Sequence, residues 1–434
     1  MKNNKTSLSN ELFIPIINYI KSKKFDEALV LLEKLSDQNP NIINSFKGSI
    51  YLNKKDWENS LYYYQKISNE EKNFKILNNI GFCLFKLGRF TEASTKYKQS
   101  IDYNNTFIPA YENLIISYKL IGNYELSIKY ILQALNLMPN NQKLKNYLID
   151  ICNYYKPKIY ENSIINTNDQ ISELDVLNKK NTLIQNSSIK NILGKSEEIL
   201  KKNYTTFNYP ETQIYRKNKL NLNCERHFGI FNKYKIIPKF CFSCYKVQIT
   251  LNNVLDLLKL YFYFNNLNLE KNNIRKCMIE LRKNVGGNYK GYLYASSINE
   301  AKNIEKIIKN DLINEKIILN KIEIKHGCTE YYDQYELYKN IDKDVTYEIY
   351  QKEWSDIEKE FDQKNLILEN NKERIYINTL NKFSLPDYLI IKNWLLYAKI
   401  IGDNSYKEVF KFDIKTDHLS KTDIQNIQLR TENN

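Results

Sequence analysis

Small residues recur along the first third of the chain at a nearly constant interval. Ala28, Ser60, Ala93 and Ser127 are spaced 32, 33 and 34 residues apart. Four positions after each of them stands an apolar or aromatic residue, namely Leu32, Tyr64, Tyr97 and Ile131. A small residue lets one helix of a pair approach the other, and the large side chain fills the remaining gap. A period of this length predicts a stack of helix pairs. One pair cannot bury its apolar face alone, and the stacked pairs together bury a continuous core.

Other positions of the repeat agree with this register. Glycines occupy the expected turn and the point of closest approach, and prolines mark two repeat ends: Gly88, Gly122, Gly48, Gly81, Pro40 and Pro139. Residues 79–93, NIGFCLFKLGRFTEA, closely resemble the consensus of the tetratricopeptide repeat (TPR). The resemblance covers residues 9–155 and implies an all-α TPR solenoid of four repeats with a capping helix at 142–154. Pro15 and Asn105 depart from the consensus.

The resemblance to TPR arrays implies a module that binds another protein on a concave surface made by the first helix of each pair. Asn79 and Asn113 share the slot in which such arrays often hydrogen-bond the backbone of a bound peptide. Beside them in the same register lie the other candidate partner-binding residues: Phe82, Lys86, Ile116 and Lys119. Asparagine is common throughout the chain, so ordinary solvated positions remain the alternative interpretation.

The composition predicts a folded, multidomain chain. With 434 residues, 42% hydrophobic and 13% aromatic residues, the chain is long enough for several cores. The net charge of +14 favours acidic partners. However, the excess of Lys, Asn, Ile and Tyr over Arg, Ala and Gly is also what an AT-rich genome produces, so the positive charge is not taken as evidence for nucleic-acid binding. No apolar segment follows Met1, and the most apolar stretch, 254–264, is too short to span a bilayer, so we expect a cytoplasmic protein without a membrane contact.

The changes in composition along the chain predict four regions. The repeat array covers 9–155, a polar and partly helical linker covers 156–205, an α+β domain with the Cys and His cluster covers 206–410, and a polar tail covers 411–434. The array is predicted to be the region that binds the partner protein.

Four residues near the middle of the chain have the spacing of a structural zinc site. Cys224 and His227 form C-x2-H, and Cys241 and Cys244 form C-x2-C. Two intervening residues let both side chains of a pair face one ion, and four such ligands close a tetrahedron around zinc. Four reduced residues in an aromatic core are the alternative. The odd total of seven cysteines and the lack of a secretory signal argue against a disulfide framework.

The periodicity after this cluster predicts strands and helices in the order βαββαβ. The strands are expected at 245–251, 275–282, 289–296 and 321–328, and the helices at 253–266 and 298–312. This order is the split, ferredoxin-like arrangement, in which one face of the sheet stays free of helices. Lys290, Tyr292 and Tyr294 resemble the start of the third-strand motif of RNA-recognition modules, which makes RNA binding the second hypothesis. The first strand lacks the aromatic residue that this family requires.

The sequence contains no strong motif of an enzyme. We find no Walker loop, dinucleotide-binding glycines, nucleophile elbow or H-E-x-x-H, and only three histidines. Because TPR arrays are sometimes fused to glycosyltransferases, a TPR-linked transferase is a third hypothesis, supported only by the D-x-D match of Asp342 and Asp344. The sequence therefore favours an adaptor or scaffold with a zinc-stabilised α+β domain.

Overall fold

The computed structural model divides the chain into two compact units. The first comprises residues 1–140 with 364–375, and the second comprises residues 141–363 with 376–434. The structure describes residues 13–35, 38–157, 162–174, 184–203, 207–216, 222–283, 285–364, 375, 378–380, 382–412, 419 and 421–432.

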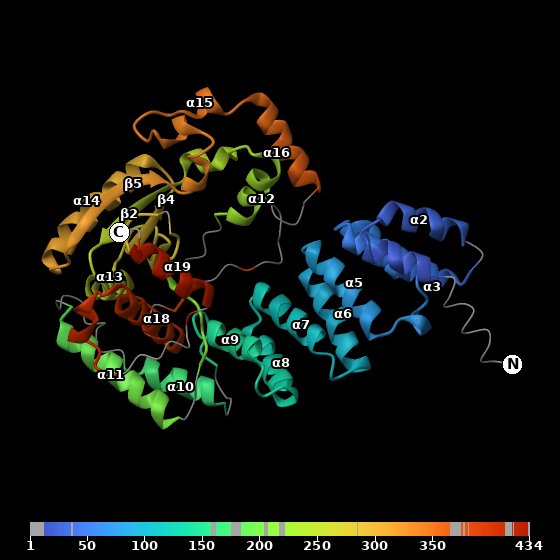
Figure 1. Cartoon of the computed structure of the whole chain (residues 1–434), viewed down its shortest axis with the longest axis horizontal. Coiled ribbons are helices and arrows are strands. Elements are labelled where there is room, and N and C mark those ends of the chain that lie inside the picture. Colours follow the sequence, from blue (N-terminus) through green and yellow to red (C-terminus); the bar gives the residue numbers. More distant parts are fainter. Residues whose placement is uncertain are drawn as a thin grey trace. The chain divides into compact units, whose positions relative to one another are not determined.

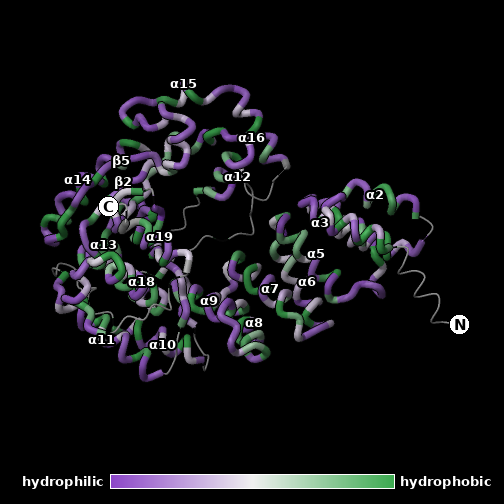
Figure 2. The backbone as a smooth tube through the Cα atoms, in the orientation of Figure 1, coloured by the Kyte–Doolittle hydropathy of each residue, from purple (hydrophilic) through white to green (hydrophobic). Residues whose placement is uncertain are grey.

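The first unit consists of antiparallel helix pairs (Figure 1). Residues 13–21 are helical and are followed by α2 (Phe25–Lys34), α3 (Pro40–Asn53), α4 (Trp57–Gln65), the short η1 (Asn69–Glu71), α5 (Phe74–Lys86), α6 (Phe90–Tyr103), α7 (Ile108–Leu120) and α8 (Tyr124–Leu137). Polar side chains start several of these helices, because a side-chain oxygen accepts a hydrogen bond from an otherwise unpaired backbone N–H. Asp56 and Asn73 cap α4 and α5 in this way. Figure 2 shows hydrophobic and hydrophilic residues alternating along these helices.

The repeat register predicted from the sequence matches the packing of the helices. The four small residues and the four large residues after them are at most 1% exposed. Gly88 and Gly122 have φ angles of 70° and 74° in the turns after α5 and α7, a conformation that favours glycine. Ser60 Oγ donates a hydrogen bond of 2.8 Å to the carbonyl oxygen of Gly48, which ties α4 to α3. The N-terminal region is therefore a helical repeat array.

The predicted boundary of the array is wrong at its C-terminal end. The helix expected to cap the array, α9 (Gln142–Ile151), belongs to the second unit and packs on α10 (Ser163–Ser172) and α18 (Leu385–Ile401). Leu144, Leu148, Ile149 and Ile151 of α9 are all 0% exposed. An apolar face buried this completely needs a larger core than the end of a solenoid provides.

The region predicted as a polar linker also contains core helices. Ile164, Ile165 and Ile171 of α10 are at most 3% exposed, and Ile189 and Leu193 of α11 (Asn186–Lys202) are 0% exposed. The composition of this segment is polar. A small number of apolar residues at helical spacing is nevertheless enough to form one buried stripe along each helix. The helix expected within the linker is present as α11, and both helices of the described part of residues 156–205 contribute buried residues to the second unit.

Gly81→Ala is expected to destabilise the array locally. A Cβ atom at Gly81 would lie 2.7 Å from Cε1 of Tyr97, whose fully buried ring cannot move away freely. Overpacking of this kind costs about 1–3 kcal/mol. Amide hydrogen exchange in α5 and α6 should therefore accelerate. Gly194→Ala in α11 is the matched control, because nothing lies within 4 Å of the added methyl group. The control should slow hydrogen exchange in α11 slightly. If neither variant accelerated the exchange of its own helix, the tight packing of α5 against α6 would be contradicted.

The second unit contains a five-stranded antiparallel sheet. Its strands are β1 (Gln213–Arg216), β2 (Tyr245–Leu251), β3 (Arg275–Ile279), β4 (Tyr289–Ala295) and β5 (Leu319–His326), in the order β1-β3-β4-β2-β5. Two helices, α13 (Val254–Asn266) and α14 (Ile298–Asn314), connect β2 to β3 and β4 to β5 (Figure 1). Each strand and helix predicted from 245 to 328 is present, with ends shifted by up to three residues. The edge strand β1 was not predicted.

One face of this sheet forms the main core of the second unit. Val247, Ile249 and Leu293 are 0% exposed, and a Cβ atom on Gly291 would lie 2.4 Å from Leu260 of α13. Helix α18 also packs on β1 and β3, and Trp394 on α18 is 0% exposed. Because side chains alternate between the two faces of a strand, the intervening residues lie on the opposite face.

The remaining elements surround the sheet. They are α12 (Cys224–Tyr234), η2 (Lys239–Ser243), η3 (Thr329–Tyr331), η4 (Glu336–Lys339), α15 (Thr346–Ile349), α16 (Lys352–Lys364), η5 (Asn404–Glu408) and α19 (Lys421–Glu432). Within the predicted polar tail, α19 packs on α18 through residues that include the fully buried Ile427, so the tail prediction is wrong there. No helix in the described ranges is long and apolar enough to cross a membrane.

Candidate functional site

The predicted partner-binding asparagines lie on neighbouring helices of the array and are partly buried. Asn113 on α7 donates a hydrogen bond of 3.1 Å from Nδ2 to Oδ1 of Asn78 on α5. Asn79 donates one of 3.0 Å to the hydroxyl oxygen of Tyr64 on α4. These bonds hold both amides in fixed positions and show that α5 and α7 present polar side chains to each other.

The remaining predicted residues form a half-exposed surface on the same helices. The ring of Phe82 meets the ring of Trp57 edge to face, with centroids 5.8 Å apart. Lys86 Nζ lies 5.3 Å from the centroid of Phe82 and 6.0 Å from that of Trp57. Ile116 and Lys119 on α7 are also partly exposed. We call Trp57, Asn79, Phe82, Lys86, Asn113, Ile116 and Lys119 the array surface. It combines apolar and aromatic area with two ammonium groups.

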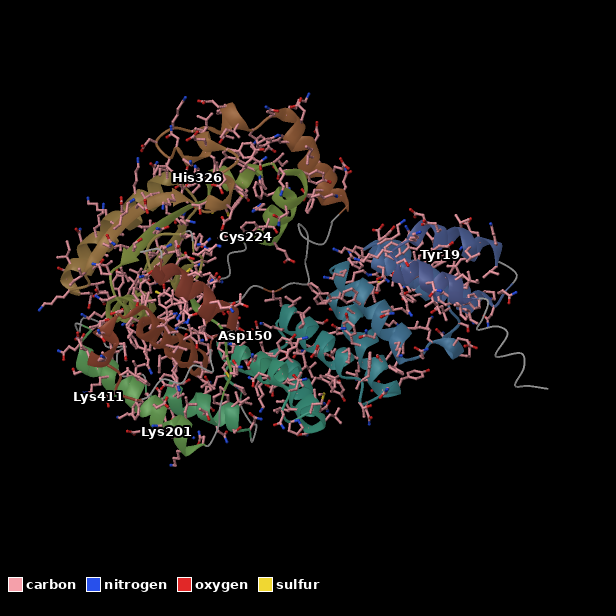
Figure 3. All side chains as sticks on the ribbon, viewed as in Figure 1. Tyr19, Asp150, Lys201, Cys224, His326 and Lys411 are labelled. Atoms are coloured by element: carbon pink, nitrogen blue, oxygen red, sulfur yellow. The ribbon has the colours of Figure 1, made fainter. Side chains whose placement is uncertain are left out.

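The predicted zinc ligands lie at one end of the sheet in the second unit. Cys241 and Cys244 stand on the η2 turn, where the amide of Cys244 donates a hydrogen bond of 3.3 Å to the carbonyl oxygen of Cys241. Cys224 is the first residue of α12 (Figure 3). A fourth thiol outside the predicted set, that of Cys328, packs against the aromatic cluster that contains Cys241.

The thiols around Cys328 influence one another electrostatically. The hydrogen bond from Cys241 lowers the pKa of Cys328 and, together with burial, raises the pKa of Cys241. Burial, followed by the nearby charge of Cys328, raises the pKa of Cys224 to about 11 and that of Cys244 to about 12.

The ring of His227 stacks on Phe240, the residue directly before Cys241, with centroids 5.1 Å apart and planes 20° apart. Burial, and then the charge of Arg226, lowers the pKa of His227 to about 4. Across the described residues, no three or more His, Cys, Asp or Glu side chains are arranged so that they could hold a metal ion. The predicted set of Cys224, His227, Cys241 and Cys244 is thus not assembled in this structure.

The face of the sheet opposite the α13 core is rich in lysine and tyrosine. The strand register places Tyr294 opposite Lys246, and it places Tyr292 opposite Gln248 on β2 and Lys276 on β3. The predicted RNA-binding tyrosines, Tyr292 and Tyr294, therefore share a face as expected. We call this surface the Lys–Tyr face and define it by Tyr215, Lys246, Lys276, Lys290, Tyr292 and Tyr294.

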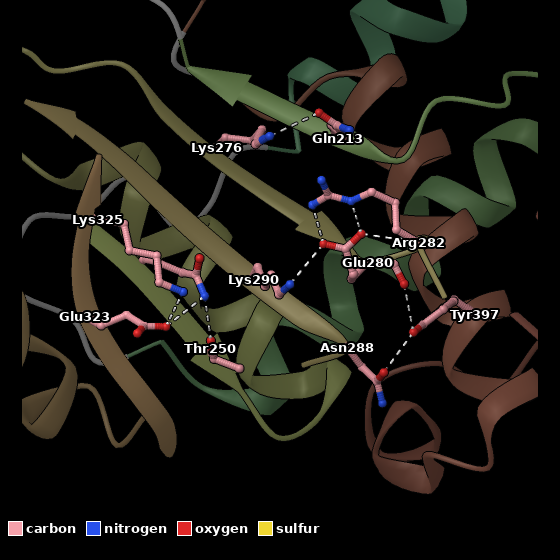
Figure 4. A network of polar contacts seen from close by, with 11 residues as sticks. Gln213, Thr250, Lys276, Glu280, Arg282, Asn288, Lys290, Glu323, Lys325 and Tyr397 are labelled. Atoms are coloured by element: carbon pink, nitrogen blue, oxygen red, sulfur yellow. Dashed lines mark hydrogen bonds and ion pairs between the residues drawn. The ribbon is translucent and has the colours of Figure 1, made fainter. Parts of the chain in front are cut away.

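The groups of the Lys–Tyr face are engaged with one another. Lys246 Nζ and Lys276 Nζ lie 5.5 and 4.9 Å from the ring centroid of Tyr292, which is only 5% exposed. Lys290 Nζ pairs with Glu280 at 2.9 Å, and Arg282 reaches the same carboxylate at 2.8 Å (Figure 4). Burial, and then repulsion from Lys246 and Arg282, lowers the pKa of Lys276 to about 8. A base could stack on Tyr292 only after these ammonium groups had moved.

Comparisons with known proteins identify no family for this chain. No protein-family model matches the chain, and no curated protein matches it significantly. A crystal structure of MamA is 16% identical, with 30% of this chain and 78% of that chain covered and a TM-score of 0.29. A MamA variant is 22% identical, with 29% and 75% covered and a TM-score of 0.27. At these scores the likeness carries no argument, so the helical repeat rests on its own packing.

Proposed function

We propose that this chain is a scaffold protein of the tetratricopeptide type, which binds a peptide or helix of a partner protein on the array surface. The observation that carries the proposal is the array surface itself, in which Trp57, Phe82 and Lys86 of neighbouring helices lie together. The amides of Asn79 and Asn113, which hydrogen-bond within the array, stand in the slot from which such arrays often bind a peptide backbone.

The chemistry of the array surface defines the class of peptide. Trp57 and Phe82 offer aromatic area, and Lys86 and Lys119 offer positive charge. Aromatic residues in half-buried positions are enriched among the residues that dominate binding energy. We therefore expect the bound peptide to carry an apolar or aromatic anchor followed by a carboxylate.

The second unit of the proposed scaffold would carry a ferredoxin-like core, a topology that the strand order β3-β4-β2-β5 supports.

Selection of a random peptide library on the purified full-length chain tests this proposal. Enriched peptides should carry an apolar anchor and an acidic residue, and Phe82→Ala with Lys86→Ala should weaken their binding at least tenfold, about 1.4 kcal/mol. Lys98→Ala with Gln99→Ala on the exposed side of α6 is the matched control and should bind normally. Enriched peptides that bind the Phe82 and Lys86 variant as tightly as the wild type would refute the proposal, as would a library without enrichment.

The two other hypotheses gain no structural support. RNA stacking needs accessible rings, whereas Tyr292 is covered by Lys246 and Lys276. The D-x-D segment of the transferase hypothesis is part of a turn, in which Asp344 Oδ1 accepts a hydrogen bond of 2.9 Å from the amide of Thr346. A local turn of this kind explains that aspartate without a sugar nucleotide.

A further inference from the structure

Strand β5 lies at an open edge of the sheet in the second unit. It is the last strand in the order β1-β3-β4-β2-β5 and, with eight residues, the longest strand in the described ranges. The strand at the other edge, β1, has four residues and packs on α18. An edge strand presents unpaired N–H and C=O groups, to which a further strand can bind. The outer side of β5 is therefore the place where another chain could extend this sheet.

The hydrogen bonds at the end of β5 show which of its backbone groups face outward. The amide of Gly327 donates a hydrogen bond of 2.8 Å to the carbonyl oxygen of Cys244, toward β2. The amide of the preceding residue, His326, instead donates one of 3.2 Å to the hydroxyl oxygen of Tyr332. Because the direction alternates along an antiparallel ladder, the backbone groups of the even-numbered residues from 322 to 326 point away from β2.

Ile322 and Ile324 carry the open backbone groups of this edge. Within the described ranges, their N–H and C=O groups have no hydrogen-bond partner. Their side chains lie on the core face, since the register pairs them with Ile249 and Val247 of β2, both 0% exposed. The core therefore already holds this backbone in an extended conformation, and little further ordering is needed when a strand binds.

The charges on the opposite face of β5 favour a second copy of the same strand. Lys321, Glu323 and Lys325 alternate in sign, and Glu323 pairs with both lysines at 2.8 Å. If two copies of β5 pair antiparallel with Ile322 opposite Ile322, each Lys321 faces Glu323 of the second copy. A shift of two residues would instead place the two Glu323 side chains opposite each other. Like charges directly opposite destabilise a strand pair, so the register centred on Ile322 is favoured.

Tyr332 disfavours the other register with complementary charges. A pairing centred on Ile324 would need the amide of His326 for the new ladder, but this amide already donates its hydrogen bond to Tyr332. A pairing centred on Ile322 needs no backbone group of His326. It brings the start of each β5 near the end of the other.

Exposed apolar side chains lie at both ends of β5. Ile313 at the end of α14 and Ile318 directly before β5 are 72% and 62% exposed. Leu337, which is 54% exposed, lies on η4, and the ring of Tyr338 on the same turn stacks on His326 at the other end of the strand. Because the start of one strand meets the end of the other in an antiparallel pair, these side chains could bury apolar area that a short ladder alone lacks.

We propose that this chain forms a two-fold symmetric dimer in which β5 pairs antiparallel with β5 of a second copy, centred on Ile322. The two five-stranded sheets would then form one continuous sheet. Such an interface uses the same surface of both copies, so the contact of Lys321 with Glu323 occurs twice and the open edge is closed on each copy. The dimer does not depend on peptide binding by the array.

Sedimentation equilibrium of the full-length wild type tests the dimer. The apparent mass should rise from one chain to two with increasing concentration. Hydrogen exchange at the amides of Ile322 and Ile324 should slow over the same range, because these amides gain partners in the dimer. A chain that stays monomeric at every accessible concentration would overturn the proposal, as would a dimer in which these two amides exchange as fast as in the monomer.

Charge variants test the register. Lys321→Glu should raise the dissociation constant of the dimer about tenfold, because two like-charge contacts replace two attractive ones. Adding Glu323→Lys to this variant reverses both members of each contact and should restore the wild-type value. Lys98→Glu, an equal change of charge on the exposed side of α6, is the matched control and should dimerise normally. A dimer that Lys321→Glu leaves unchanged, or that the double variant fails to restore, would refute the pairing at Ile322.

Discussion

Asp387→Asn is expected to lower the free energy of unfolding of the second unit by about 3–5 kcal/mol. Asp387 on α18 accepts two hydrogen bonds from Arg216 on β1, at 3.1 Å from Nη1 and 2.9 Å from Nη2. The two side chains are 1% and 5% exposed. Asparagine removes the negative charge but not the guanidinium, which would remain buried without compensation. Hydrogen exchange of the amides of α18 and β1 measures the loss.

A double variant distinguishes charge pairing from packing in this prediction. Arg216→Met with Asp387→Leu should recover much of the stability that either single change removes, because buried ion pairs can often be replaced by apolar residues of similar size. Some loss should remain, since Tyr261 and Ser384 also hydrogen-bond with the pair. Asp356→Asn, which breaks the exposed pair with Lys359 on α16, is the control and should cost less than about 0.5 kcal/mol. If the double variant lost as much free energy of unfolding as the two single variants together, the prediction would be contradicted.

The features that the sequence predicted correctly depend on local patterns. The burial of Ser60 and Tyr64 follows from a period that each repeat displays by itself, and β2 follows from the alternation of Val247 and Ile249 with polar residues. Such patterns reflect which side of an element is buried, so no knowledge of its neighbours is needed. The shape of the array and the position of most strands were therefore accessible from the sequence.

The features that the sequence missed depend on tertiary partners. The apolar face of α9 is compatible with a capping helix, and only the presence of α10 and α18 decides where it packs. The four-residue strand β1 has no pattern long enough to detect. Cys328 lies too far from the C-x2-C pair for spacing arguments, and only the pairing of β2 with β5 brings it there.

The charged centre of the Lys–Tyr face was missed for the same reason. Glu280 and Lys290 are ten residues apart and meet only because β3 and β4 pair antiparallel, with Met278 opposite Lys290. The sequence therefore suggested Lys290 as a free cation for RNA, whereas the structure pairs it with a carboxylate. Both side chains are about 1% exposed, so this pair contributes to the folded state rather than to an open binding surface.

Glu280→Gln is expected to destabilise the second unit at pH 7 by about 3–5 kcal/mol, because the buried charge of Lys290 would lose the carboxylate that compensates it. Glutamine preserves the size of the side chain, so the change tests charge rather than packing. Urea unfolding followed by hydrogen exchange in β3 and β4 measures the loss. Glu336→Gln is the matched control, since Glu336 is 90% exposed and 3.8 Å from Lys339, and its effect should stay below about 0.5 kcal/mol.

The difference between the wild type and Glu280→Gln should shrink in acid. Burial alone would raise the pKa of Glu280, but hydrogen bonds from Arg282 and Lys290 outweigh it and hold the pKa at about 2, below the ordinary value of 4.5. The unfolded chain therefore binds the proton first, and the stabilisation by Glu280 is complete above pH 4.5 and is lost as the pH falls toward 2. At pH 3.5 the difference should be smaller than at pH 7 by about 1 kcal/mol. Other carboxylates titrate alike in both chains, so a difference that stays constant would show that Glu280 is not held ionised by its neighbours.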